Sequence, residues 1–147
     1  MKEIFGSCLC GSIEYKFKED ELFSYQCHCS ICQKSTGSAY STTLMARKDL
    51  FEWLKGKEHI ASFSKHSGYM TSFCRSCGST VPNKFREYPF MSVPVGGLEV
   101  SESIKVGAQL HLGSKASWET EGYEGSLYDD MPSISDMFNL LHLEGKA

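Results

Sequence analysis

The sequence lacks a long run of apolar residues. Of its 147 residues, 41% are hydrophobic and 22% are charged, and no stretch approaches the ~20 apolar residues that a membrane-spanning helix requires. The opening residues 1–6 also lack the continuous apolar core of a secretory signal. We therefore expect no membrane partner and no cleaved signal, and we place the protein in the cytoplasm.

A dense basic face is missing as well. The net charge is −3, and residues 116–145 hold seven acids and no Lys or Arg, which leaves 14 bases against 11 acids in residues 1–115. Proteins that bind nucleic acid usually carry a much larger local excess of bases. We therefore expect no nucleic-acid partner, although the mildly basic body is compatible with a small anionic ligand.

Several common catalytic signatures are also missing. The sequence contains no Gly-rich phosphate loop, no Ser nucleophile elbow and no His-Glu-x-x-His helix. The isolated histidines have no ligand-like neighbours in the sequence and are interpreted as ordinary surface or core residues: His59, His66, His111 and His142. Metal chemistry at the cysteines is the remaining possibility.

The length and patterning predict a single, mainly β domain over residues 1–147. Short segments of alternating polarity are separated by Gly and Pro, which is typical of short antiparallel strands with few short helices. Hairpins are expected over residues 2–18 and around Ser67-Gly68. Further strands are expected over residues 22–26, 38–46, 79–85, 90–95 and 108–112.

Helical structure is expected in two places. One turn is predicted over residues 30–35, ended by Gly37. The acidic C-terminal segment, about residues 119–147, is predicted to include a short helix capped by Ser133 or Ser135. Its apolar residues Ile134, Met137, Phe138 and Leu141 would share one face. Residues 49–54 fit either a short helix or a strand.

Seven cysteines fall into three tight clusters. An odd number fits poorly with complete disulfide pairing, and clustered cysteines in the cytoplasm more often bind metal. The alternatives are that the cysteines are small hydrophobic residues buried in the core, or that they form disulfides. Three clusters of this kind favour metal binding.

Two of the clusters end in glycine and resemble each other. Cys8-Leu9-Cys10-Gly11 lies at the turn of the first hairpin, and Cys74-Arg75-Ser76-Cys77-Gly78 is a typical zinc knuckle. Together they supply the four thiolates of a closed structural zinc site on Cys8, Cys10, Cys74 and Cys77. Such a site would clamp two segments that lie more than sixty residues apart.

The third cluster lacks an obvious fourth ligand. Cys27, Cys29 and Cys32 leave one position of a tetrahedral zinc open, as catalytic sites usually do. His28 is the nearest candidate, but on an extended segment its side chain would point away from the face shared by Cys27 and Cys29. We therefore predict an open, catalytic zinc site on the three cysteines.

These motifs, in order and with suitable gaps, resemble the glutathione-dependent formaldehyde-activating enzymes, whose domain is shared with centromere protein V. The matching residues are Cys8–Gly11 with Tyr15, Cys27–Cys32 with Lys34 and Gly37, Phe73–Ser79, and Gly113–Trp118. The resemblance implies an Mss4-like zinc-binding β-fold and the same partition of the cysteines into a structural and a catalytic zinc. Gln33 and Ser117 depart from the Arg and Pro that are frequent in the family.

The resemblance also implies an activity. It suggests a carbon–sulfur lyase, an enzyme that joins a glutathione-type thiol to a small aldehyde such as formaldehyde, with two zinc ions per chain as cofactors and glutathione as co-substrate. One alternative is a zinc-stabilised binding module without turnover. Another is a lyase or transferase that acts on a different thiol adduct, which the change at Gln33 leaves open.

Overall fold

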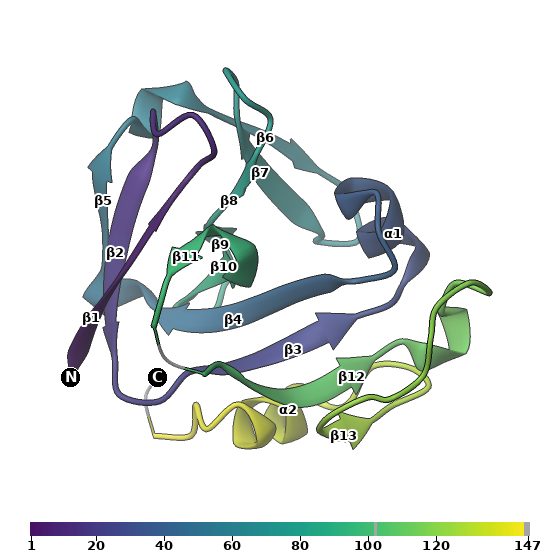
Figure 1. Ribbon diagram of the computed structural model, residues 1–147. Coiled ribbons are helices and arrows are strands. Elements are labelled where there is room, and N and C mark those ends of the chain that lie inside the picture. The colour runs from purple at the N-terminus through teal and green to yellow at the C-terminus, as the bar shows by residue number, and fades with distance from the viewer. Residues whose placement is uncertain (102, 146–147) are drawn as a thin grey trace. The chain divides into compact units, whose positions relative to one another are not determined.

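The computed structural model describes residues 1–101 and 103–145 (Figure 1). These residues form thirteen β-strands and two α-helices, which confirms the predicted mainly β fold. The chain divides into two compact units, one built from the described residues of 1–21 and 45–103 and the other from those of 22–44 and 104–146. The single domain over residues 1–147 stays a prediction. No helix in the described ranges is long and apolar enough to cross a membrane.

The first unit contains only strands and short 3₁₀ turns. Its strands form the order β11-β1-β2-β5, the order β6-β7-β8, and a β9-β10 pair. The strands are β1 (Lys2–Ser7), β2 (Glu14–Glu19), β5 (Phe51–Lys55), β6 (Ile60–Ser64), β7 (Met70–Cys74), β8 (Thr80–Val81), β9 (Asn83–Lys84), β10 (Phe90–Pro94) and β11 (Leu98–Glu99). The 3₁₀ turns are η1 (Lys48–Leu50), η2 (Lys57–His59) and η3 (Val95–Gly97).

The β1–β2 hairpin confirms the prediction for residues 2–18. The two strands pair antiparallel, with Ile4 opposite Phe17, and the alternating residues Tyr15 and Phe17 are buried. Tyr15 also stacks on Phe51 of β5, with ring centroids 5.7 Å apart. This packing holds the hairpin turn that carries Cys8 and Cys10.

The β6–β7 hairpin confirms the second prediction and delivers the other cysteine pair. The strands pair antiparallel from Ser64 and Met70 to Ile60 and Cys74. After Cys74 the chain turns back, with the Gly78 N–H donating to the Cys74 carbonyl at 2.8 Å. Gly78 has a φ of +76°, a left-handed conformation that glycine adopts without steric cost.

Three predictions for the segments around these hairpins need correction or completion. The strand predicted over residues 79–85 is two short strands, because Pro82 has no N–H to continue the ladder. The strand predicted over 38–46 begins only at Ser41. Residues 49–54, left undecided between helix and strand, contain the end of η1 followed by β5.

The second unit combines strands with both α-helices. Its elements are β3 (Phe23–Cys27), α1 (Ser30–Thr36), the first part of β4 (Ser41–Arg47), β12 (Lys105–Leu110), η4 (Leu112–Ser114), β13 (Ser126–Leu127) and α2 (Ile134–Leu140). The strands follow the order β13-β12-β3-β4. The predicted helical turn and its end at Gly37 are confirmed, since Gly37 caps α1 in the left-handed conformation.

Parallel pairing in the second unit is a difference from the purely antiparallel strands that the sequence predicted. β12 pairs parallel to β3, with Leu110 opposite Cys27, and it also pairs parallel to β13. β3 and β12 are about eighty residues apart in the sequence. Parallel strands are joined by long crossovers and never by a tight turn, so no local turn signal announces this pairing.

The C-terminal helix α2 lies beside β12 (Figure 1). Ser133 caps it as predicted, accepting a hydrogen bond from the Asp136 N–H at 3.0 Å. Met137 and Leu141 on the predicted apolar face are buried. The helix backbone approaches β12 so closely that a Cβ atom on Gly107 would lie 3.0 Å from the Leu140 carbonyl oxygen. The helix therefore supports the strand that adjoins Cys27.

Replacing Met137 with alanine is expected to lower the free energy of unfolding by ~2–5 kcal/mol, because the side chain is completely buried and its loss leaves a cavity. Urea denaturation measures this difference. Asn139→Ala is the matched control, since Asn139 lies in the same helix and is exposed. It should change stability by no more than ~0.5 kcal/mol. Equal losses in the two variants would contradict the packing of α2.

Candidate metal centres

Four cysteine sulfurs of the first unit converge. Cys8, Cys10, Cys74 and Cys77 place their Sγ atoms within 4.8 Å of one another. The Cys8–Cys10 and Cys10–Cys74 sulfur pairs are 3.6 and 3.8 Å apart. A tetrahedral zinc with Zn–S bonds of ~2.3 Å requires S···S separations of about 3.8 Å. The cluster therefore has the dimensions of a closed four-thiolate zinc site.

The thiols of this cluster differ in acidity. Burial raises the pKa of Cys8, whereas a hydrogen bond from the Ser12 hydroxyl lowers the pKa of Cys10. The hydroxyl of Ser79, 3.3 Å from the Cys77 sulfur, lowers the pKa of Cys77 to about 5. Two of the four thiols are thus more acidic than an ordinary cysteine, and the thiolate is the form that binds metal.

Three cysteine sulfurs of the second unit form another cluster. Cys27 ends β3, Cys29 caps the N-terminus of α1, and Cys32 lies in the first turn of that helix. Their Sγ atoms lie within 4.8 Å of one another, and no His, Asp, Glu or further Cys among the described residues joins them by this criterion. The Cys32 N–H donates to the Cys29 sulfur at 3.4 Å. The cluster offers three ligands and leaves a fourth position free.

The thiols of this second cluster change one another's pKa values. A hydrogen bond from the Cys27 thiol lowers the pKa of Cys32 to about 6, and the same bond raises the pKa of Cys27. Ser41 and the charge of His111 contribute further to the low pKa of Cys32. Cys32 is therefore the more acidic thiol of this pair.

His28 points away from the cysteines, as the alternation of side chains predicts. Its completely buried ring lies between two side chains of the same unit. Nε2 is 2.6 Å from Gln109 Oε1, and Nδ1 is 2.8 and 2.9 Å from the two carboxylate oxygens of Glu119. Both ring nitrogens are occupied, so neither is available to a metal.

The glutamines around His28 fix its position. Gln109 Nε2 donates to Gln26 Oε1 at 2.7 Å and to the Glu124 carbonyl at 3.2 Å, so its Oε1 is turned toward His28. Gln33, the departure from the family pattern, donates from Nε2 to the carbonyls of His28 and Ser114 at 2.8 and 2.9 Å. This network anchors the backbone between Cys27 and Cys29.

Sequence reasoning missed most of these supporting residues. Glu119 and Gln109 lie 91 and 81 residues from His28 and carry no local motif. His111 was interpreted as an ordinary residue, but its charge acts on Cys32 and it has a left-handed φ of 58°. That conformation is uncommon for a residue other than glycine. The one feature of the sequence that could have drawn attention to His111 is its position at the end of a predicted strand.

Replacing Glu119 with alanine is expected to lower the free energy of unfolding by ~1–3 kcal/mol, because it leaves the buried His28 Nδ1 without its partner. Thermal and urea denaturation measure the loss. Glu121→Ala is the matched control. Its carboxylate is 78% exposed and pairs with Lys115, and such surface pairs contribute ~0–1 kcal/mol. If Glu119→Ala were no more destabilising than the control, the pair with His28 would not support the fold.

Comparisons with known proteins agree with this architecture. The chain is similar in fold to the crystal structure of a protein from Rhodobacter sphaeroides, with a TM-score of 0.57, 22% sequence identity, and coverage of 69% of this chain and 98% of that one. No curated protein matches the sequence. The family described as "Glutathione-dependent formaldehyde-activating enzyme" matches residues 3–114, a range that contains all seven cysteines. The chain therefore belongs to the glutathione-dependent formaldehyde-activating enzyme family.

Proposed function

We propose that the protein is a zinc-dependent carbon–sulfur lyase that forms and cleaves the adduct of a glutathione-type thiol with a small aldehyde such as formaldehyde. The observation that carries the proposal is the contrast between the two clusters. Four thiols of the first unit could supply all four ligands of a tetrahedral metal ion, whereas the three thiols of the second unit would leave one ligand position free. Family membership supports the choice of thiol and aldehyde.

Each cysteine has a role in this proposal. Cys8, Cys10, Cys74 and Cys77 would hold a structural zinc, and Cys27, Cys29 and Cys32 would hold the catalytic one, giving two zinc ions per chain. Sulfur-rich tetrahedral sites favour zinc over magnesium, calcium or manganese. When bound, the catalytic zinc lowers the pKa of a coordinated thiol. Three cysteine thiolates leave such a centre with a charge of about −1, which suits a soft thiolate better than hydroxide.

The proposed reaction conserves atoms and charge. The thiol sulfur forms a bond to the aldehyde carbon, the carbon–oxygen π bond opens, and the proton lost from sulfur ends on the new hydroxyl. The cleavage direction reverses these changes. No oxidant or reductant takes part.

The cytoplasm is the proposed compartment. All seven cysteines have free thiols in the structure, and thiols stay reduced in the cytoplasm, where glutathione is the main redox buffer. The proposed zinc sites require reduced cysteines, so the cytoplasm is the compartment that suits them.

The function is tested by metal analysis and by exchange spectroscopy on the purified protein. We expect two zinc ions per chain and an interconversion of formaldehyde, glutathione and their adduct that is faster than without protein. The zinc-depleted protein provides the control. Two zinc ions with exchange at the uncatalysed rate would overturn the formaldehyde assignment and favour a binding module or a different thiol adduct.

A further inference from the structure

Helix α1 supplies two of the three thiols of the open cluster and has no buried side chain of its own. Cys29 is its N-cap, and Cys32 lies in its first turn. The helix has seven residues, and none of them is buried. An isolated helix shorter than ~12 residues is only marginally stable in water. The positions of these two thiols therefore depend on the polar contacts that attach α1 to the elements around it.

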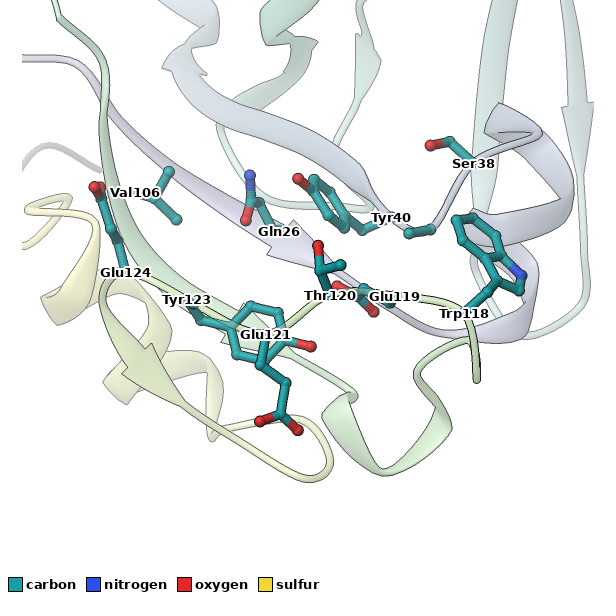
Figure 2. Close-up of a pocket in the computed structure, with 12 residues that line it drawn as sticks. Gln26, Ser38, Tyr40, Val106, Trp118, Glu119, Thr120, Glu121, Tyr123 and Glu124 are labelled. Atoms are coloured by element: carbon teal, nitrogen blue, oxygen red, sulfur yellow. The ribbon is translucent and has the colours of Figure 1, made fainter.

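His28, the residue between the first two thiols, is held firmly by the strands. Its N–H donates to the Leu110 carbonyl at the end of β12, at 2.9 Å. Its buried ring lies 2.8 Å from a carboxylate oxygen of Glu119 and 4.9 Å from the ring of Tyr40. Figure 2 shows Glu119 and Tyr40 among the residues that line a cavity on that side of β3. The strands thus fix the loop at Cys27, and α1 has to be attached to that loop.

Gln33 makes this attachment. Its Nε2 atom donates to the His28 carbonyl at 2.8 Å and to the Ser114 carbonyl, at the end of η4, at 2.9 Å. A side-chain amide nitrogen carries two hydrogens, so both of its donors are used. The backbone N–H of Gln33 also donates to the Cys29 carbonyl at 3.0 Å. One side chain therefore joins α1, the loop that carries the first two thiols, and the η4 turn.

We propose that Gln33 is a positioning residue for the three-thiol site, which sets the affinity of that site for its metal. The inference rests on the proposed function, because it requires a metal on Cys27, Cys29 and Cys32. Without the two hydrogen bonds of the Gln33 amide, α1 could shift against the loop and move Cys32 away from Cys27. Residues that orient metal ligands without touching the metal typically change affinity or activity by ~10–100-fold.

Gln33→Met tests the inference, because methionine keeps the length of the side chain and removes both donors. We expect the metal affinity of the three-thiol site, measured by competition with a chelator, to fall by about tenfold or more. The affinity of the four-thiol site should stay within about twofold. Lys34→Met is the matched control, since Lys34 is exposed in the same helix, and it should change neither affinity by more than about twofold. Gln33→Arg returns N–H donors to this position and should recover most of the lost affinity.

Cadmium-113 spectra separate a positioning role from a purely structural one. Cadmium is a soft metal that thiolates bind as they bind zinc, and its resonance responds to the number and geometry of its sulfur ligands. The two clusters should therefore give separate resonances. Gln33→Met should shift or broaden the resonance of the three-thiol site and leave that of the four-thiol site unchanged. A residue that only stabilised the fold would lower the melting temperature without moving either resonance.

The zinc-loaded wild-type protein offers a measurement that needs no variant. Both side-chain amide protons of Gln33 are hydrogen-bonded, so they should exchange with water about tenfold or more slowly than those of an exposed amide. Exchange at the rate of an exposed amide would overturn the inference even where Gln33→Met does not fold.

The failure of this inference can be told apart from the failure of the proposed function. Wild-type affinity and an unchanged cadmium resonance at the three-thiol site of Gln33→Met would overturn the inference alone. A wild-type protein that binds no metal at this cluster would overturn the proposed function and the inference with it.

Discussion

Replacing Cys74 with alanine is expected to remove the proposed zinc of the first unit and to unfold that unit. Cys74 is completely buried at the end of β7, and its sulfur meets that of Cys10 from the first hairpin, 64 residues earlier. Structural zinc contributes ~10–16 kcal/mol in small zinc-dependent domains. The entire stability of a typical domain is only ~5–15 kcal/mol. The variant should therefore lose one zinc per chain. Its NMR spectrum should lose most of the amide chemical-shift dispersion that a folded protein shows.

The control for this prediction changes a neighbour that is not a ligand. Ser79 lies 3.3 Å from the Cys77 sulfur and accepts a hydrogen bond from the Leu9 N–H at 2.9 Å. Ser79→Ala should keep both zinc ions while its Cys77 becomes less acidic. Zinc removal from the wild type with a strong chelator should reproduce the unfolding. A Cys74→Ala protein that stays folded with two zinc ions would refute the clamp.

Replacing Cys29 with alanine is expected to give a folded protein that retains one of the two proposed zinc ions and lacks the proposed exchange activity. The cluster of the second unit would keep only two thiols, too few to hold the metal firmly. The fold should suffer only modestly. Cys29 is partly exposed and acts as the N-cap of a seven-residue helix, and removing a cap costs ~0.5–2 kcal/mol. Metal analysis, denaturation and exchange spectroscopy separate these effects.

Two further variants distinguish metal binding from helix capping. Cys29→Ser keeps a capping atom but loses the soft thiolate ligand, so it should restore stability without restoring exchange. Ser35→Ala changes an exposed residue of the same helix and should behave as wild type. If Cys29→Ser exchanged formaldehyde at the wild-type rate, the activity would not depend on three thiolates.

The proposed function gives the two clusters different roles, one structural and one chemical, and these variants can separate the two roles. Removing the Cys74 thiol should appear first as unfolding of the first unit. Removing the Cys29 thiol should appear as a loss of turnover in a folded protein. Measurements on the two clusters can therefore give independent results.

Local patterns in the sequence determined much of the secondary structure of this protein and the grouping of its cysteines. Alternating residues such as Tyr15 and Phe17 predicted the first hairpin, and Gly37 and Ser133 marked the end of α1 and the start of α2. The spacing and the following glycines also divided the seven cysteines into the two groups that the structure brings together. These signals are local because strand alternation, caps and tight turns depend on a few neighbouring residues.

Only the tertiary structure decided what surrounds the open cluster. The parallel pairing of β3 with β12 places Gln109 beside Gln26 and brings Glu119 to His28. No periodicity encodes that contact, because parallel strands pair across long connections and the choice of partner depends on the burial of the whole unit. The sequence by itself thus determined which cysteines group together, and the fold decided which distant side chains support them.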